Sequence, residues 1–161
     1  PEHGMVEYCR RHGIALLCYG TVAGGLLSDR WLGAPAPEEP LANRSLVKYR
    51  LIVEEFGGWD AFQSLLRTLR AIADRHGCDV ATVATRAVLE RPGVAAAIVG
   101  ATSTRHLAAH AQVGALRLDA EDFARLAQAT ARRRGPPGDV YTLERDREGP
   151  HGRIMKYTLN R

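Results

Sequence analysis

The sequence predicts a parallel α/β fold with two buried strands and flanking helices. One observation is an apolar run over residues 15–19 that leads into a glycine-rich stretch, residues 20–25. A second apolar run, residues 94–99, has the same order and is followed by a loop of small residues. Between the two runs lie apolar residues at helical spacing, as expected for the long crossover that parallel strands require. Ligands of such folds bind at the carboxyl ends of the strands, so we expect a site where the two loops meet.

Helices are expected along most of the remaining chain, because apolar residues recur there every three or four positions. Residues 28–43 contain three prolines and predict a loop over the surface instead. The longest expected helix carries an apolar stripe that faces the core. The helices expected are residues 5–11, 45–56, 59–75, 80–88, 104–113 and 120–131.

Four side chains are expected to begin these helices by accepting a hydrogen bond from a free backbone N–H group. Ser45, Asp79 and Ser103 stand at the start of three of the predicted helices. Asp119 is followed three residues later by a second carboxylate, Asp122, and this spacing resembles a helix start. A carboxylate at such a position stabilises the start of the helix, which argues against catalytic roles for Asp79 and Asp119.

The C-terminal part of the chain differs in character from the rest. Residues 135–138, Gly-Pro-Pro-Gly, interrupt the helical pattern. Beyond them, residues 140–143 and 154–159 are expected to be extended, separated by charged and glycine residues. We therefore divide the chain into an α/β unit, residues 1–134, and a tail, residues 135–161, which forms either a hairpin or an arm over another surface.

Composition predicts a globular protein, and we expect it in the cytoplasm and without a membrane contact. The 161 residues suffice for one domain, and 45% of them are hydrophobic and 25% charged. No apolar stretch approaches the ~20 residues that span a bilayer, and residues 1–4 have none of the pattern of a signal peptide. Cys9, Cys18 and Cys78 have no paired metal spacing, so we expect reduced thiols and no metal site.

The formal net charge of +4 gives little support for an anionic partner, because the excess is spread thinly. The densest basic run, residues 132–134, follows an expected helix. Cations at that position complement the negative end of the helix dipole. A basic adaptor for nucleic acid, using this run and the tail, is one alternative reading, but we expect no nucleic-acid partner.

Four blocks of sequence together resemble the aldo-keto reductase family. They are residues 8–14 (YCRRHGI), 19–28 (YGTVAGGLLS), 83–86 (VATR) and 94–103 (VAAAIVGATS). In this order they are similar to the last two strands of the family's barrel, the last barrel helix and the two loops that meet the cofactor's phosphates. The resemblance covers about residues 5–131.

The resemblance implies that the chain is the C-terminal part of a TIM (β/α)8 barrel. It also implies reversible reduction of a small-molecule carbonyl with hydride from a nicotinamide cofactor, NADP by the family's habit, with NAD possible. The family's catalytic tyrosine, lysine, aspartate and histidine match nothing in this chain, so none of its residues is expected to be catalytic. We expect a fragment that lacks the N-terminal half of the barrel and is inactive alone.

The first loop is expected to hold the middle of the cofactor. By the resemblance, the ring of Tyr19 would lie against the nicotinamide face. Substitution of Gly24 by valine is expected to weaken dinucleotide binding with little effect on folding, because it blocks close approach of the backbone. The residues whose backbone N–H groups would wrap the pyrophosphate are Gly20, Thr21, Val22, Ala23, Gly24, Gly25 and Leu26.

The second loop is expected to hold the adenosine end of the cofactor at the start of a helix, where the dipole favours an anion. Family members often have a lysine or arginine near residues 102–103, and a glutamine and an asparagine where this chain has histidines. Arg105, His106 and His110 could still bind adenine or phosphate; alternatively they are solvated helix residues. The residues that would meet the 2′-phosphate are Gly100, Ala101, Thr102 and Ser103.

An alternative function is a non-catalytic module that binds a dinucleotide or regulates another protein. It has the same two loops, so the loops alone do not separate it from an enzyme fragment. The module is expected to be monodisperse when isolated and to bind a dinucleotide. A fragment of a barrel instead exposes an apolar face and two strand edges, and we expect it to associate.

Overall fold

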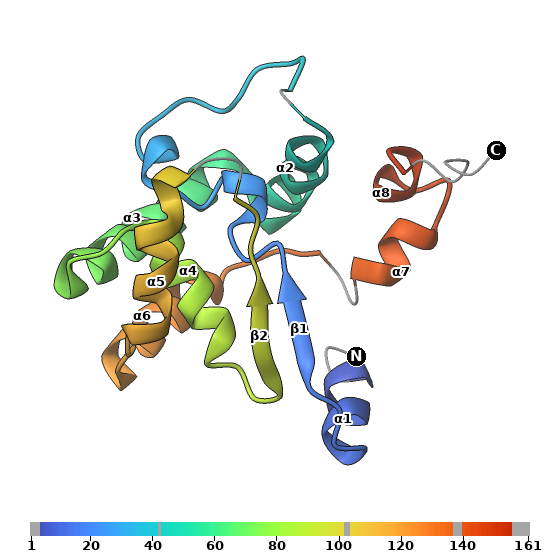
Figure 1. Ribbon diagram of the computed structural model, residues 1–161. Helices are drawn as coiled ribbons and strands as arrows, with labels where there is room; N and C mark the ends of the chain where they lie inside the picture. The colour runs from blue at the N-terminus through green and yellow to red at the C-terminus, as the bar shows by residue number, and fades with distance from the viewer. Residues whose placement is uncertain (1–3, 42, 102–103, 137–139, 156–161) are drawn as a thin grey trace.

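The computed structural model describes residues 4–41, 43–101, 104–136 and 140–155. Its centre is a sheet of two strands, β1 (Leu16–Tyr19) and β2 (Val94–Ile98). The strands lie side by side and parallel, with Leu16 opposite Val94, Tyr19 opposite Ile98 and one irregularity after Leu16 (Figure 1). The predicted pairing of the two apolar runs is therefore confirmed, with each strand shorter by one residue than the run that predicted it.

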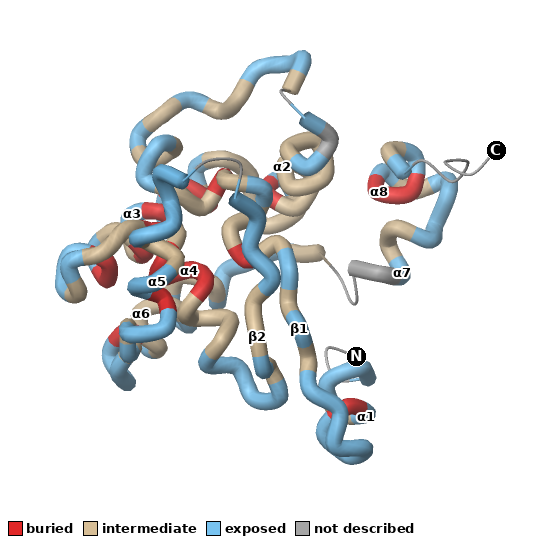
Figure 2. Tube along the Cα trace, viewed as in Figure 1, coloured by how far each residue is buried: buried red, intermediate tan, exposed pale blue. Residues whose placement is uncertain are grey.

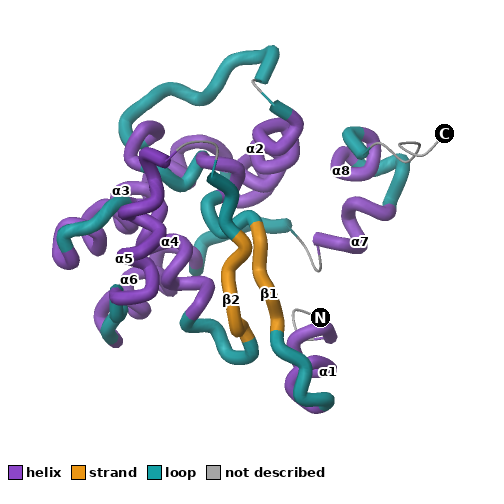
Figure 3. Tube along the Cα trace, in the orientation of Figure 1, coloured by secondary structure: helices purple, strands orange, loops and turns teal. Residues whose placement is uncertain are grey.

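Helices make up most of the described chain, in agreement with the sequence pattern (Figure 3). No described helix combines the length and apolar character needed to cross a membrane. Short 3-10 turns follow both strands: η1 (Ala23–Gly25) and η2 (Asp29–Trp31) after β1, and η3 (Thr104–His106) after β2. The helices are α1 (Gly4–Arg11), α2 (Arg44–Phe56), α3 (Gly58–His76), α4 (Val80–Leu89), α5 (Leu107–Ala115), α6 (Ala120–Thr130), α7 (Val140–Arg145) and α8 (Pro150–Arg153).

The hydrophobic core lies between the crossover helices, on one side of the sheet (Figure 2). Helix α3 contributes its apolar stripe, including Leu66 and Ile72, and α4 contributes Val80 and Val83; all four are fully buried. Leu26, which follows the glycine loop, is buried in the same cluster. Since burial of a leucine side chain is worth roughly 1.5–3 kcal/mol, this contact fixes the loop after β1 to the helical layer.

The opposite face of the sheet is exposed. Leu17 and Tyr19, two residues apart on β1, therefore point to one face and are 61% and 56% exposed. Ile98 at the end of β2 is 57% exposed. The two-stranded sheet thus presents apolar side chains that no described residue covers fully.

Two of the predicted helix caps are confirmed and one is wrong. Asp79 accepts a hydrogen bond from the N–H group of Thr82, and Asp119 begins α6. Ser45 does not cap α2, because Asn43 takes this position and its Oδ1 accepts from the N–H group of Leu46 at 3.0 Å. Asparagine and serine are both good N-cap residues. Because Asn43 comes first in the chain, the helix begins directly after it, at Arg44. The predicted cap Ser103 lies outside the described residues.

The prediction of an extended tail is wrong for its first part. Val140–Arg145 forms helix α7, and a second short helix, Pro150–Arg153, follows it. A strand needs a neighbour for its backbone groups, whereas this segment satisfies them internally, and Pro150 stands in the first helical turn, where its missing N–H costs nothing. Residues 156–159, also expected to be extended, lie outside the described residues. An ion pair and a hydrogen-bonded contact join the tail helices to α2 and are described below.

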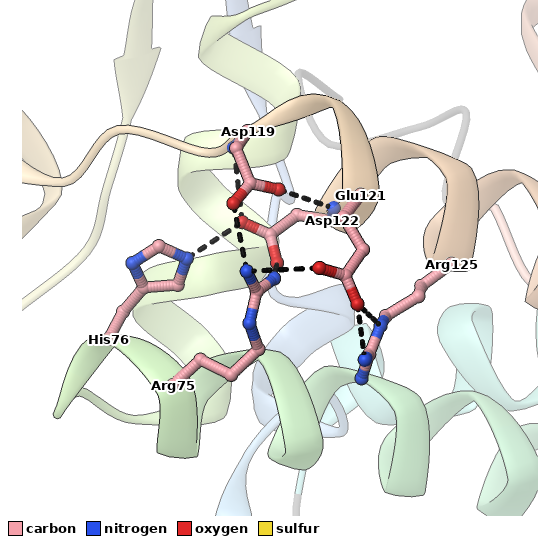
Figure 4. Close-up of polar contacts among 6 residues, drawn as sticks. All are labelled: Arg75, His76, Asp119, Glu121, Asp122 and Arg125. Carbon is pink, nitrogen blue, oxygen red and sulfur yellow. Dashed lines mark hydrogen bonds and ion pairs between the residues drawn. The ribbon is translucent and has the colours of Figure 1, made fainter.

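A cluster of charged side chains joins the end of α3 to the start of α6 (Figure 4). Asp122 is fully buried, and its carboxylate accepts from the Arg75 guanidinium and lies 2.7 Å from Nε2 of His76. Asp119 and Asp122 also form a capping box, each side chain accepting from the other residue's N–H group at 2.9 and 3.1 Å. Arg75 donates to Asp119 as well, at 2.8 Å. The cluster therefore fixes α6 against α3.

We predict that this cluster makes the stability of the protein sensitive to acid. Hydrogen bonds from the N–H group of Asp122 and from Arg75 lower the pKa of Asp119. A carboxyl group with a lowered pKa contributes stability above its unfolded pKa of about 3.9 and loses it as the pH falls through the folded value. Urea unfolding should therefore show Asp119→Asn less stable than the parent near neutral pH, with the difference shrinking below about pH 4. A difference that stays constant down to acid pH would contradict this.

Candidate functional site

The two loops that follow the strands enclose one cavity of about 580 Å3. Its floor comes from the carboxyl ends of β1 and β2, and its walls come from α2, α4 and α5. This is the edge of the sheet at which the sequence predicted a ligand site. Small-molecule sites usually measure about 300–1,000 Å3, so the cavity is large enough for a ligand of that class.

Nine of the residues proposed from the sequence line this cavity. The first loop supplies six and the second loop and its helix supply three. Ala23, Leu26, Ala101 and Arg105 do not line it, and Thr102 and Ser103 lie outside the described residues. The nine are Tyr19, Gly20, Thr21, Val22, Gly24, Gly25, Gly100, His106 and His110.

The first loop is a tight double turn, and some of its N–H groups are already used. Those of Ala23, Gly25 and Leu26 donate to carbonyl oxygens within the loop at 2.9, 2.9 and 3.2 Å. Leu26 turns its side chain into the core, so it anchors the loop and does not face the cavity. Any backbone contact with an anion would thus come from the other residues of the loop, Gly20, Thr21, Val22 and Gly24.

Tyr49 of α2 is the principal residue of the site that sequence reasoning missed. A Cβ atom on Gly20 would lie 2.0 Å from its hydroxyl oxygen, and one on Gly24 would lie 2.8 Å from its ring. Both glycines also have positive φ angles, of 71° and 65°. The loop therefore needs glycine twice over, for its backbone and for the room that the tyrosine ring takes. Tyr49 precedes the buried Val53 by four residues, and that helical spacing could have placed its ring on the inward face.

A buried hydrogen bond ties the first loop to α4. The hydroxyl groups of Thr21 and Thr85 lie 3.0 Å apart, and both residues are almost fully buried. Thr85 belongs to the VATR block, for which the sequence predicts a helix but no role for this residue. Because an unpaired buried hydroxyl is costly, the pair holds the loop and the helix at a fixed distance.

The second loop places basic side chains beside the cavity. His106 ends the turn η3 and accepts a hydrogen bond from Nε of Arg105 at 3.2 Å. His110 lies one turn further along, on α5, and lines the cavity together with His106. Arg105 is exposed outside the lining, so it reaches the cavity only through His106 in this arrangement.

Polar side chains around the cavity can donate hydrogen bonds to a ligand. Two imidazoles, the hydroxyl group of Ser45 and the amide of Asn43 can donate to phosphate or ribose oxygens. The acidic residue in the lining, Asp79, is engaged as the cap of α4. Within the described parts of the chain, no three His, Cys, Asp or Glu side chains gather as a metal site would require.

Comparison with known proteins identifies the family. A sequence profile described as the aldo/keto reductase family matches residues 1–131, four fifths of the chain. The chain belongs to the aldo/keto reductase family. The match includes both strands, both loops and the helices α1 to α6, and it stops before the tail helices. The resemblance inferred from the four sequence blocks is thereby confirmed.

Two curated relatives show how much of an aldo/keto reductase chain is present. Flagellar radial spoke protein 5 of Chlamydomonas reinhardtii is 36% identical over 85 residues, which are 51% of this chain and 16% of that protein. An aryl-alcohol dehydrogenase of Pestalotiopsis microspora is 28% identical over 122 residues, 75% of this chain and 28% of the relative. The chain thus corresponds to less than a third of the length of either relative.

Proposed function

We propose that this chain supplies the cofactor-binding loops of an NADP-dependent carbonyl reductase. The observation that carries the proposal is that the glycine-rich loop after β1 and the loop after β2 line one cavity. Family membership and the relative named as an aryl-alcohol dehydrogenase support oxidoreductase chemistry for the whole protein. NADPH, bound there, would supply the hydride to the carbonyl carbon and leave as the oxidised cofactor.

Each part of the lining has a distinct task in this proposal. Tyr19 offers an exposed ring at the end of β1 as a stacking surface for the nicotinamide. The glycine loop lets the pyrophosphate approach the backbone closely. His106 and His110 hold the adenosine end, and Arg105 adds a positive charge beside His106, which favours a 2′-phosphate and therefore NADP over NAD.

The rest of the reaction comes from outside these residues in this proposal. No described residue matches the family's proton donor, so the chain alone is inactive. The exposed apolar face of the sheet, with Leu17, Tyr19 and Ile98, is the surface on which the remaining strands of a TIM barrel would pack. In this proposal the partner of the chain is the N-terminal half of the barrel. We place the whole protein in the cytoplasm.

A non-catalytic dinucleotide-binding module remains the second candidate. It is favoured by one observation, that the relative with the higher identity is named as a flagellar radial spoke protein and not as an enzyme. Cofactor binding by the same cavity is common to both functions. Reductase activity of the protein containing this chain separates them, because the module predicts binding without turnover.

Titration of the chain with NADPH, followed by the fluorescence of the reduced cofactor, tests the proposal. We expect saturable binding that is weaker for NADH, and a loss of about tenfold in affinity for His106→Ala, the effect of one hydrogen bond to a charged group. The matched control is His12→Ala, at the opposite end of the sheet, which should bind as the parent does. Equal affinities for the two variants, or no saturable binding by the parent chain, would overturn the assignment.

A further inference from the structure

Helix α2 presents a polar face to the tail, next to the face that carries Tyr49. Lys48 and Glu55 lie seven residues apart, two helical turns, and so share one side of the helix. Lys48 forms an ion pair with Glu144 of α7. Glu55 lies 2.8 Å from Nε2 of His151 on α8, whose side chain is almost fully buried. The tail therefore contacts α2 at two points, one from each tail helix.

The order of the side chains in these two contacts fixes how the tail lies on α2. Along α2 the lysine precedes the glutamate, and along the tail the glutamate Glu144 precedes His151. A shift of the tail by two turns would place Glu144 beside Glu55, which like-charge repulsion opposes. Polar pairs shielded from water are weak sources of stability but are well attested as devices that set register. The pairs thus specify the placement of the tail more than its affinity.

The contact at Lys48 continues to the cavity. Its ammonium nitrogen lies 6.0 Å from the centre of the Tyr19 ring and 5.9 Å from the centre of the Tyr49 ring, within the range of cation–π attraction. Both tyrosines line the cavity, one at the end of β1 and one against the glycine loop. Although burial disfavours the charged form, the hydrogen bond and ion pair with Glu144 raise the pKa of Lys48, so the ammonium stays charged.

We propose that Glu144 is a positioning residue for the cavity, and that it acts through Lys48 on the rings of Tyr19 and Tyr49. The carboxylate of Glu144 holds the ammonium group of Lys48 near both rings. The ammonium group in turn fixes the Tyr19 ring at the end of β1 and the Tyr49 ring against the glycine loop. The tail thereby affects the ligand site, because the ion pair between Glu144 and Lys48 sets the positions of the two rings. The effect on a dinucleotide rests on the function proposed above, whereas the effect on the rings does not.

The test uses 19F NMR of the chain labelled with 3-fluorotyrosine, together with NADPH titration. Glu144→Gln keeps the shape of the side chain and removes its charge, and we expect it to shift the resonances of Tyr19 and Tyr49. NADPH affinity should fall about two- to fivefold, the range of one cation–π contact. Glu144→Asp keeps the charge, so its tyrosine resonances and its NADPH affinity should lie closer to those of the parent than the values for Glu144→Gln. Resonances are assigned by replacing each tyrosine with phenylalanine.

Two further variants make the test decisive. Glu148→Gln, in a tail carboxylate that is 91% exposed, should change neither the two resonances nor the affinity. Lys48→Met should reproduce the shifts of Glu144→Gln, and it carries the test if the Glu144 variant does not fold. Unchanged ring resonances in a folded Glu144→Gln or Lys48→Met variant would overturn the proposal. Shifted resonances in a chain that binds no NADPH would support the positioning role and overturn only the cofactor assignment.

Discussion

Replacement of Asp122 by alanine is expected to lower the free energy of unfolding by about 2–4 kcal/mol, measured by urea denaturation. The carboxylate is fully buried and serves Arg75, His76 and the N–H group of Asp119 at once (Figure 4). Its loss removes the acceptor of His76 and of the Asp119 N–H group, whereas Arg75 keeps its pairs with Asp119 and Glu121. The expected cost is below that of a fully buried pair, because Arg75 and His76 are themselves partly exposed and regain contact with water.

The matched control for Asp122 is Glu121→Ala, one position earlier on the same helix. Glu121 is 56% exposed and forms ion pairs with Arg75 at 3.4 Å and with Arg125 at 2.6 Å. Exposed pairs are typically worth about 0–1 kcal/mol, so this variant should stay close to the parent. If Asp122→Ala were as stable as Glu121→Ala, the cluster would not be what fixes α6 to α3.

Replacement of Gly24 by valine is expected to destabilise the protein by about 2–5 kcal/mol. The sequence led us to expect little effect on folding, and the structure corrects this. Gly24 has a φ of 65°, which a β-branched residue adopts with strain, and a Cβ atom there would lie 2.8 Å from the Tyr49 ring. Any loss of dinucleotide binding in this variant would therefore combine damage to the loop with blocked access to the backbone.

Gly25→Val separates the backbone strain of Gly24→Val from its clash with the Tyr49 ring. Gly25 also has a positive φ, of 95°, but a Cβ atom there would meet no heavy atom within 4 Å. It should therefore show the backbone strain without the clash and lose less stability than Gly24→Val. Combining Gly24→Val with Tyr49→Ala should cost less than the sum of the two single changes. Additive losses would show that the ring does not pack on Gly24.

The arrangement of strands and helices was largely predictable, because it depends on local patterns. Apolar runs with bordering glycines gave β1 and β2, and the long spacing between them required the helical crossover that the structure has. Caps at Asp79 and Asp119 followed from residue type and spacing. The start of α2 was misplaced because Asn43 and Ser45 are both good caps, and the tail was wrong because short apolar runs suit a strand or a helix equally.

The candidate site was predictable only in part, since half of it depends on contacts between distant segments. The glycine loop and the second loop stand out in the sequence, and the structure brings them to one cavity. Tyr49, Thr85 and Lys48 belong to helices whose inward faces could be inferred from the sequence. Their partners lie 25 to 96 residues away, and no spacing rule links such distant residues. Leu26, expected at the cofactor, instead anchors the loop to the core.

The most direct test of the central claim is a map of backbone amide chemical shifts of the chain during titration with NADPH. We predict that the perturbed amides fall into two groups, residues 19–25 and residues 100–110, which are far apart in sequence and both include residues that line the cavity. Perturbations confined to one of these loops, or gathered on another surface such as the exposed sheet face, would contradict a single dinucleotide site built from both.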